Sequence, residues 1–138
     1  MGNTRILRKA LTIGGKIGSI YIDGRGLFQE LAHSSEVKFG QLSLLRVNPG
    51  CARGGHYHTR KEEWFCCIHG KCKMEMTNVK DGTTRDAILE DSKKEFVLIK
   101  PFESHLVRNF NKSEICELLV IVSEEYDPED PDTVKYGG

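Results

Sequence analysis

Three histidines and one glutamate of this 138-residue chain have the types and spacing of a metal site. His56 and His58 are two residues apart, so on a strand both side chains lie on the same face and can converge on one point. Glu63 begins the next predicted strand and can add a carboxylate oxygen, and His105 can supply a third imidazole. Three imidazoles and one carboxylate suit first-row divalent ions (Zn, Fe, Mn, Co, Ni) better than Ca or Mg.

A simpler interpretation places His56 and His58 on a solvent-facing strand with no ligand between them. The flanking residues argue against it, because Arg53-Gly54-Gly55 precedes the pair, Glu63 follows it, and Pro101 stands four residues before His105. At typical residue frequencies, a chance match of Gly, His, His, Glu and Gly at fixed spacing arises in about one chain in 10,000 or fewer. We therefore predict a metal site at these residues.

These side chains must be positioned by strands, because strand signals dominate the chain. Short apolar and β-branched segments, separated by Gly, Pro, Asn and Asp, fall at 37–47, 63–69, 72–78, 87–89, 96–99, 106–110 and 115–122. Segments 63–69 and 72–78 flank Gly70-Lys71 and are predicted to form a hairpin. One helical turn is expected near 5–11. Many short strands without helical periodicity between them predict an all-β antiparallel sandwich or barrel.

Composition limits the classes of function. Twenty Lys and Arg balance twenty Asp and Glu, so the formal net charge is zero. Nucleic acids and anionic membranes attract proteins with a basic excess, so we expect neither as a partner. No apolar run approaches the ~20 residues of a spanning helix, and no secretory leader is expected. Five cysteines without a CxxC spacing favour free thiols in a reducing compartment, so the cytoplasm is the expected location.

The segment from Gly50 to Gly70 matches G-x5-H-x-H-x4-E-x6-G, the first motif of the cupin superfamily, at every fixed position. The second cupin motif is matched at His105 and Asn109 but not at its glycine and proline positions. The chain therefore resembles the cupins. The resemblance implies a small antiparallel β-barrel, the double-stranded β-helix or jelly roll, with one divalent ion. Zn is the expected ion, with Fe, Mn, Ni or Co as alternatives, and the implied ligands are His56, His58, Glu63 and His105.

A narrower resemblance covers residues 20–134. The segments DGRGLF at 23–28, RGGHYH at 53–58 and YDPE at 126–129, with PDT at 131–133, are similar to segments of the sugar-nucleotide cupins. These include the cupin domain of capsular polysaccharide reductase/epimerases and the epimerases and ketoisomerases of dTDP-4-keto-6-deoxy sugars. The resemblance implies one cupin domain over 1–138, with an N-terminal extension at 1–18 and an irregular tail at 124–138.

The implied activity is epimerisation or isomerisation of a nucleotide-linked 4-keto-6-deoxyhexose for surface polysaccharide. This chemistry removes a proton from carbon beside a carbonyl, and a divalent cation can stabilise the enolate oxygen. Arg53 is a candidate clamp for a phosphate or sugar oxygen, or a rim arginine in solvent, and Lys61 and Arg108 are weaker substrate-binding candidates. Tyr57 and His105 are the candidate bases, although Tyr57 should face away from the ligands and His105 cannot act while it coordinates metal.

Two other functions stay open for this chain. Cupins that hold iron or nickel on the same ligands act as metal-dependent dioxygenases, and a cupin can also bind a sugar or another small molecule without turning it over.

We expect the chain to form a homodimer. The N-terminal strands before Pro49 exceed what a minimal barrel requires, and open sheet edges favour pairing.

Overall fold

A computed structural model describes residues 5–10 and 17–137, and this part of the chain folds from β-strands alone. Twelve strands, β1 to β12, form three antiparallel sheets within these residues. The described residues contain no helix that could cross a membrane. The all-β antiparallel architecture predicted from the strand signals is confirmed.

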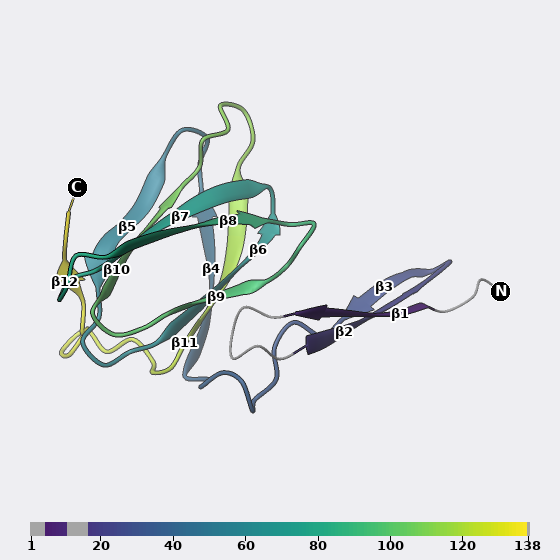
Figure 1. Ribbon diagram of the computed structural model, residues 1–138, viewed down its shortest axis with the longest axis horizontal. Coiled ribbons are helices and arrows are strands. Elements are labelled where there is room, and N and C mark those ends of the chain that lie inside the picture. Colours follow the sequence, from purple (N-terminus) through teal and green to yellow (C-terminus); the bar gives the residue numbers. More distant parts are fainter. Residues whose placement is uncertain (1–4, 11–16, 138) are drawn as a thin grey trace.

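Two of the sheets pack together as the body of the molecule, and the third extends from it as an arm (Figure 1). The five-stranded sheet has the order β12 (Val134–Lys135), β5 (Ala52–Tyr57), β10 (Glu103–Arg108), β7 (Lys71–Asn78) and β8 (Thr84–Glu90). The four-stranded sheet has the order β4 (Gln41–Val47), β11 (Cys116–Val122), β6 (Glu63–His69) and β9 (Phe96–Ile99). The arm consists of β1 (Arg5–Ala10), β2 (Ile17–Asp23) and β3 (Gly26–Gln29).

The core lies between the two sheets of the body. Along β7 the side chains alternate, so that Met74 and Met76 are buried while Lys73 and Glu75 between them are only partly buried. This period of two is what a strand with one covered face requires. The same core takes side chains from both sheets, including Val47, Phe65, Cys67, Leu89, Val107 and Leu118.

Strand β6 differs from β7 because both of its faces are covered. Its first five residues are all buried, and Trp64 and Cys66 belong to a second apolar cluster with Phe96 and Ile121. Residues from the segment before β4 pack on that cluster, namely Leu31, Ala32 and Val37. The segment between the arm and the body therefore covers the outer face of the four-stranded sheet.

The hairpin predicted at Gly70 is wrong. Strand β6 pairs with β11 and β9, whereas β7 pairs with β10 and β8, so the chain changes sheets at this glycine. Gly70 has φ +82°, and a Cβ there would lie 2.6 Å from the carbonyl oxygen of Ile115. Gly is therefore needed at this corner for a left-handed backbone and for close approach, not for a two-stranded turn.

The two terminal predictions have different outcomes. The helical turn expected near 5–11 is wrong, because 5–10 forms β1 and pairs in register with β2, from Arg5 opposite Ile22 to Ala10 opposite Ile17. Pairing with a neighbouring strand overrides a weak local preference. The tail is irregular apart from β12, where Val134 pairs with Tyr57 and Lys135 with His56. Within the predicted extension, 1–4 and 11–16 lie outside the described residues.

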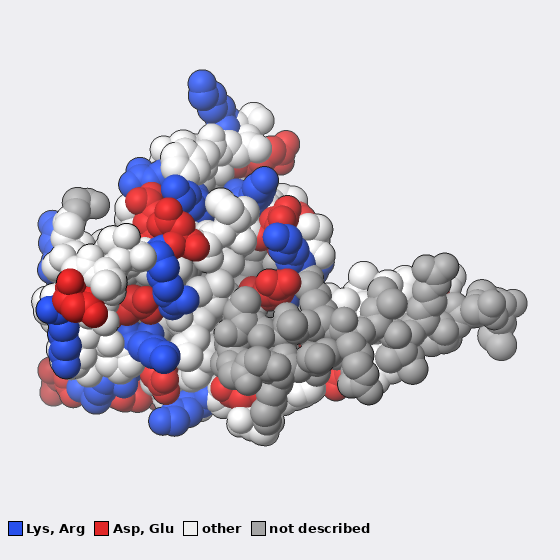
Figure 2. All heavy atoms as spheres, viewed as in Figure 1, with Lys and Arg blue, Asp and Glu red and all other residues white. Residues whose placement is uncertain are grey.

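Charges of both signs are mixed over the face of the body shown in Figure 2. Ion pairs within the two sheets include Arg46 with Glu117 at 2.9 Å, on neighbouring strands, and Arg85 on β8 with Glu103 on β10 at 2.8 Å. This distribution agrees with the net charge of zero, and this face has no basic area of the kind that binds a polyanion.

Candidate metal centre

The four predicted ligands come from both sheets of the body. His56 on β5 and His105 on β10 are direct partners across two paired strands, and Glu63 opens β6 in the opposite sheet. His58 follows the last residue of β5. The register of β5 against β10 shifts beside His105, because His105 is opposite His56 whereas Leu106 is opposite Gly54. This bulge turns the end of β5 so that residues far apart in sequence meet.

Gly54 makes this bulge possible. It has φ +116°, and a Cβ at this position would lie 2.6 Å from the carbonyl oxygen of His105. Any other residue would push β5 away from β10 at the pair of strand positions that carries His56 and His105. The glycine-rich segment before the histidines therefore sets the distance between two of the ligands.

One ligand atom from each of the four residues lies within 4.8 Å of all the others. Glu63 Oε1 is 2.7 Å from His58 Nε2 and 3.1 Å from His105 Nε2, and the rings of His56 and His105 have centroids 4.7 Å apart. A tetrahedral zinc ion with bonds near 2.0–2.2 Å separates its ligand atoms by about 3.4 Å. Small side-chain movements would therefore fit these donors around one ion.

At His56 and Glu63 the environment favours the protonation states that a metal requires. Burial lowers the pKa of His56 to about 4, and the neighbouring His105 and His58 act in the same direction. Burial alone would raise the pKa of Glu63, but hydrogen bonds from His105 and His58 lower it to about 2. A neutral imidazole and an ionised carboxylate are the ligand forms that bind divalent ions.

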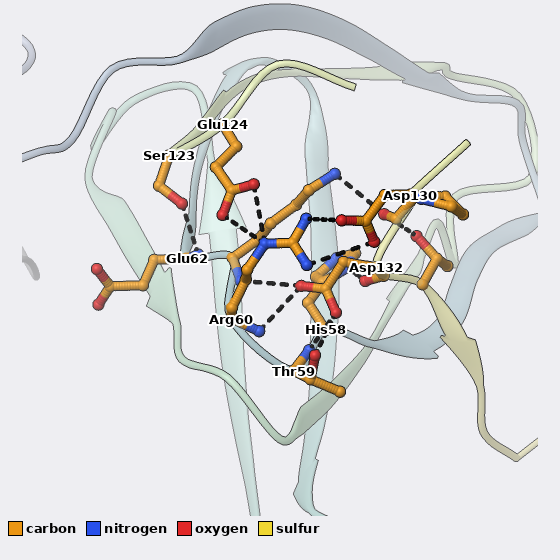
Figure 3. A network of polar contacts seen from close by, with 11 residues as sticks. His58, Thr59, Arg60, Glu62, Ser123, Glu124, Asp130 and Asp132 are labelled. Carbon is orange, nitrogen blue, oxygen red and sulfur yellow. Dashed lines mark hydrogen bonds and ion pairs between the residues drawn. The ribbon is translucent and has the colours of Figure 1, made fainter. Parts of the chain in front are cut away.

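The ring of His58 is oriented by a hydrogen bond at Nδ1, the nitrogen that does not face the cluster. Its Nδ1 lies 2.7 Å from the backbone oxygen of Asp132 (Figure 3). Its Nε2 faces Glu63 at 2.7 Å. Burial alone would lower the pKa of His58, but its hydrogen bonds with Glu63 and the Asp132 carbonyl raise it. For His105 the corresponding contact is longer, 3.4 Å from Nδ1 to the oxygen of Glu103.

A cavity of about 290 Å³ opens beside the four ligands and is lined by all of them. Arg53 and Lys61, two of the three predicted substrate-binding residues, also line it. Lys61 is only 4% exposed, its Nζ donates to the Pro131 oxygen at 3.0 Å, and its ammonium lies 5.7 Å from the ring centroid of Tyr126. The cavity therefore places two cationic side chains near the cluster.

The structure does not bring two other predicted residues to the cavity. Arg108 lies outside the cavity lining and pairs with Glu75 at 2.8 Å, while its neighbour Val107 lines the cavity. Tyr57, which was expected to face away, packs against Phe102 and Tyr136 with ring centroids 6.1 Å apart. Both results follow from the alternation of side chains along a strand. A substrate-binding role for Arg108 and a catalytic role for Tyr57 find no support here.

Sequence reasoning missed the polar and aromatic residues that complete the cavity wall. They come from β4 and from the C-terminal tail, and they are Gln41, Ser43, Glu124, Tyr126 and Thr133. The signal that could have found the tail residues is the segment YDPEDPDT at 126–133. This segment was predicted to be irregular and was noted as similar to the sugar-nucleotide cupins, but it was not placed at the site, where its Tyr126 and Thr133 line the cavity.

Comparison with known proteins identifies the family. The profile of the polysaccharide biosynthesis C-terminal domain matches residues 21–134. The chain belongs to this family. Across 83% of its length, this polysaccharide biosynthesis domain is 32% identical to a UDP-2-acetamido-2,6-beta-L-arabino-hexul-4-ose reductase of Pseudomonas aeruginosa, of which it spans 30%.

Solved structures with the same fold include sugar enzymes. CapF, a capsular polysaccharide assembling protein of Staphylococcus aureus, matches 88% of the domain with a TM-score of 0.69 and 27% identity, over 34% of its own chain. A dTDP-4-dehydrorhamnose 3,5-epimerase of Sulfolobus tokodaii matches 96% with a TM-score of 0.73 and 19% identity, over 81% of its chain. The sugar 3,4-ketoisomerase QdtA of Thermoanaerobacterium thermosaccharolyticum matches 94%, over 86% of its chain, with a TM-score of 0.70 and 19% identity. The predicted jelly-roll fold class is confirmed.

Proposed function

We propose that this domain is a metal-dependent epimerase or isomerase of a nucleotide-linked 4-keto-6-deoxyhexose in surface polysaccharide biosynthesis. The observation that carries the proposal is the cluster of half-buried His56 with buried His58, Glu63 and His105, at the wall of a cavity that Arg53 and Lys61 also line. The family is one of polysaccharide biosynthesis domains, which supports the choice of substrate class.

The donor set fits zinc better than a hard cation such as magnesium, because three of the four ligand atoms are imidazole nitrogens. A bound divalent ion would act as a Lewis acid on a carbonyl oxygen of the sugar, next to the carbon that loses its proton. The burial of His58, Glu63 and His105 keeps water away from this position and strengthens electrostatic interactions there.

The two cations of the cavity are suited to hold an anionic substrate. An ammonium group has three N–H donors, and the Pro131 oxygen accepts one from Lys61. We expect the others to bind sugar or phosphate oxygens inside the cavity. Arg53 is exposed at the cavity wall, and its guanidinium can make paired hydrogen bonds to a phosphate. A nucleotide sugar offers both kinds of oxygen.

Proton exchange tests this proposal directly. Protein stripped of metal and protein reloaded with zinc are incubated with a 4-keto-6-deoxy sugar nucleotide in heavy water, and deuterium entry beside the carbonyl is followed by NMR. We expect exchange only in the zinc-loaded sample, reduced by Arg53→Gln and unchanged by Arg108→Gln, which alters an arginine outside the cavity. Undiminished exchange in metal-free protein would rule out a catalytic ion.

Proton exchange, binding of the nucleotide sugar and oxygen consumption together separate the alternatives. A cupin that only binds sugars would hold the nucleotide sugar without exchange in any sample, and a dioxygenase would consume oxygen when loaded with iron. The relatives named above act on sugars or assemble capsular polysaccharide, so the comparisons give no support to the oxygenase.

We also propose that the domain is a cytoplasmic homodimer. Four of its five cysteines are buried, and all five are free, which agrees with a reducing compartment. Large apolar side chains are exposed on the arm and on the neighbouring edge of the body, where a second copy could cover them. They are Leu27, Phe28, Phe39, Leu42 and Leu44.

A further inference from the structure

The carboxylate of Asp132, in the C-terminal tail, binds the loop that follows His58 (Figure 3). Its Oδ1 accepts hydrogen bonds from the backbone nitrogen of Thr59 at 2.9 Å and from the Thr59 hydroxyl. Its Oδ2 accepts from the backbone nitrogens of Arg60 at 2.9 Å and of Lys61 at 3.1 Å. One side chain thus satisfies four donors from three consecutive residues.

The backbone of the same residue reaches His58 itself. The Asp132 carbonyl oxygen lies 2.7 Å from His58 Nδ1. A carbonyl oxygen only accepts hydrogen bonds, so Nδ1 must carry a proton. Nε2 faces the cluster, 2.7 Å from the Glu63 carboxylate, which also only accepts, so without an ion Nε2 carries a proton as well. When an ion replaces the Nε2 proton, the Asp132 carbonyl keeps the proton on Nδ1 and so favours the tautomer that binds metal through Nε2.

Neighbouring contacts of the tail are of a different kind. Asp130 makes an ion pair with Arg60 at 3.1 Å, and its side chain is 64% exposed. Solvent weakens such a pair, so it contributes little to the position of the loop. Within the described tail, Asp132 is the residue that contacts both the ring of His58 and the three residues after it.

We propose that Asp132 is a positioning residue of the metal centre. Its carbonyl holds His58 in the Nδ1–H tautomer, and its carboxylate locks the loop 59–61 against the tail so that this carbonyl stays in place. The inference rests on the proposed metal site. Groups that orient a ligating histidine from behind contribute about 10- to 100-fold to metal affinity.

Two substitutions test the carboxylate without straining the backbone. Asp132 has φ +49°, a left-handed conformation that asparagine and glycine also adopt readily. Whichever way the amide of Asp132→Asn is turned, it replaces one acceptor with a donor that faces backbone N–H groups. Asp132→Gly removes the side chain altogether. Asp130→Asn is the matched control, because it removes a carboxylate from the same tail without touching His58.

The measurements are zinc affinity, by competition with a coloured chelator, and the tautomer of His58. Long-range ¹H–¹⁵N spectra of zinc-loaded protein report which ring nitrogen of His58 keeps its proton. We expect the wild-type protein and Asp130→Asn to show the Nδ1–H form and equal zinc affinity. Both Asp132 variants should bind zinc about 10- to 100-fold more weakly and show an increased share of the Nε2–H form.

Two results would overturn the proposal. One is an Nε2–H ring of His58 in the zinc-loaded wild-type protein, which can be read even if the variants fail to fold. The other is wild-type zinc affinity and tautomer in both folded Asp132 variants. If the wild-type protein binds no zinc, the proposed function fails instead. Loss of the hydrogen-bonded Nδ1–H signal of His58 in Asp132→Asn, but not in Asp130→Asn, would then still support the contact between Asp132 and the ring.

Discussion

At the scale of single residues, Glu63 connects two of the three histidines of the cluster. Its Oε1 contacts both His58 and His105, and it is the only carboxylate among the four clustered residues of the described chain. These contacts also explain why its pKa is lowered to about 2 in spite of burial. Glu63 therefore contributes charge as well as geometry to the proposed site.

The first prediction concerns Glu63→Gln, which keeps the shape of the side chain and removes one negative charge. We expect metal affinity to fall by more than the roughly 10- to 100-fold that is typical for groups that only orient a ligand, because a direct ligand is changed. Activity per bound ion should persist, since less ligand charge offsets the ion, while total activity falls with occupancy. Elemental analysis combined with deuterium exchange gives both quantities. Equal metal content in Glu63→Gln and wild-type protein would contradict the assignment.

The second prediction concerns His56 in metal-free protein. Its pKa is about 4 when folded and 6.5 in the unfolded chain, so between these values the unfolded state binds more protons. The free energy of unfolding should therefore rise with pH across this window and be lost as pH falls from about 6.5 to about 4. Urea titrations over a pH series measure the slope.

The matched variants for this slope are His56→Gln and His69→Gln, the latter at an exposed position. His56→Gln should flatten part of the pH dependence of stability between the two pKa values, and His69→Gln should leave it as in the wild-type protein. An unchanged slope in His56→Gln would show that the ring is not titrating as burial requires.

At the scale of elements, the bulge between β5 and β10 decides how close the ligands come. Gly54 sits opposite Leu106 where the register shifts, and the carbonyl oxygen of His105 occupies the space that a Cβ would need. Backbone cannot move aside as a flexible side chain can, so a larger residue at this position must separate the two strands.

The third prediction is therefore that Gly54→Ala destabilises the domain by about 3 kcal/mol, through backbone strain and strand separation. Gly82→Ala is the control, because Gly82 also has a positive φ, +77°, but has open space around it. It should lose only about 1 kcal/mol. Chemical denaturation compares the two variants, and zinc affinity should fall in Gly54→Ala alone. Equal stability losses would refute a role for close packing.

At the scale of the whole molecule, the arm formed by β1, β2 and β3 lies outside the body that holds the site (Figure 1). Leu27 is 59% exposed and Phe28 68% exposed on β3. A sheet this small, with an apolar surface and open edges, gains stability when a second chain covers it. This is the physical reason for expecting a dimer.

The fourth prediction is that the wild-type protein is a dimer by light scattering at micromolar concentration and that Phe28→Asp shifts it towards monomer. A charge at the centre of an apolar contact costs desolvation energy that the dimer must supply. Ile88→Asp, at an exposed apolar position on β8 of the body, is the control and should remain dimeric. A monomeric wild-type protein would contradict the prediction.

Much of this protein was predictable from local sequence patterns. Alternating and β-branched segments predicted most strands of the body, and the fixed spacing of His56, His58 and Glu63 predicted the cluster that the structure brings together. These predictions succeed because a strand repeats every two residues, so short-range spacing determines which side chains share a face.

Tertiary structure alone decided the rest. Strands β6 and β7 are neighbours in sequence but lie in different sheets, because β6 pairs with the distant strand β11 and β7 with the distant strand β10. Lys61 lines the cavity, where its ammonium donates a hydrogen bond to the Pro131 oxygen of the distant tail. Asp132 binds His58 across a separation of 74 residues. Such contacts arise only when folding closes long loops, and no local pattern records which partners will meet.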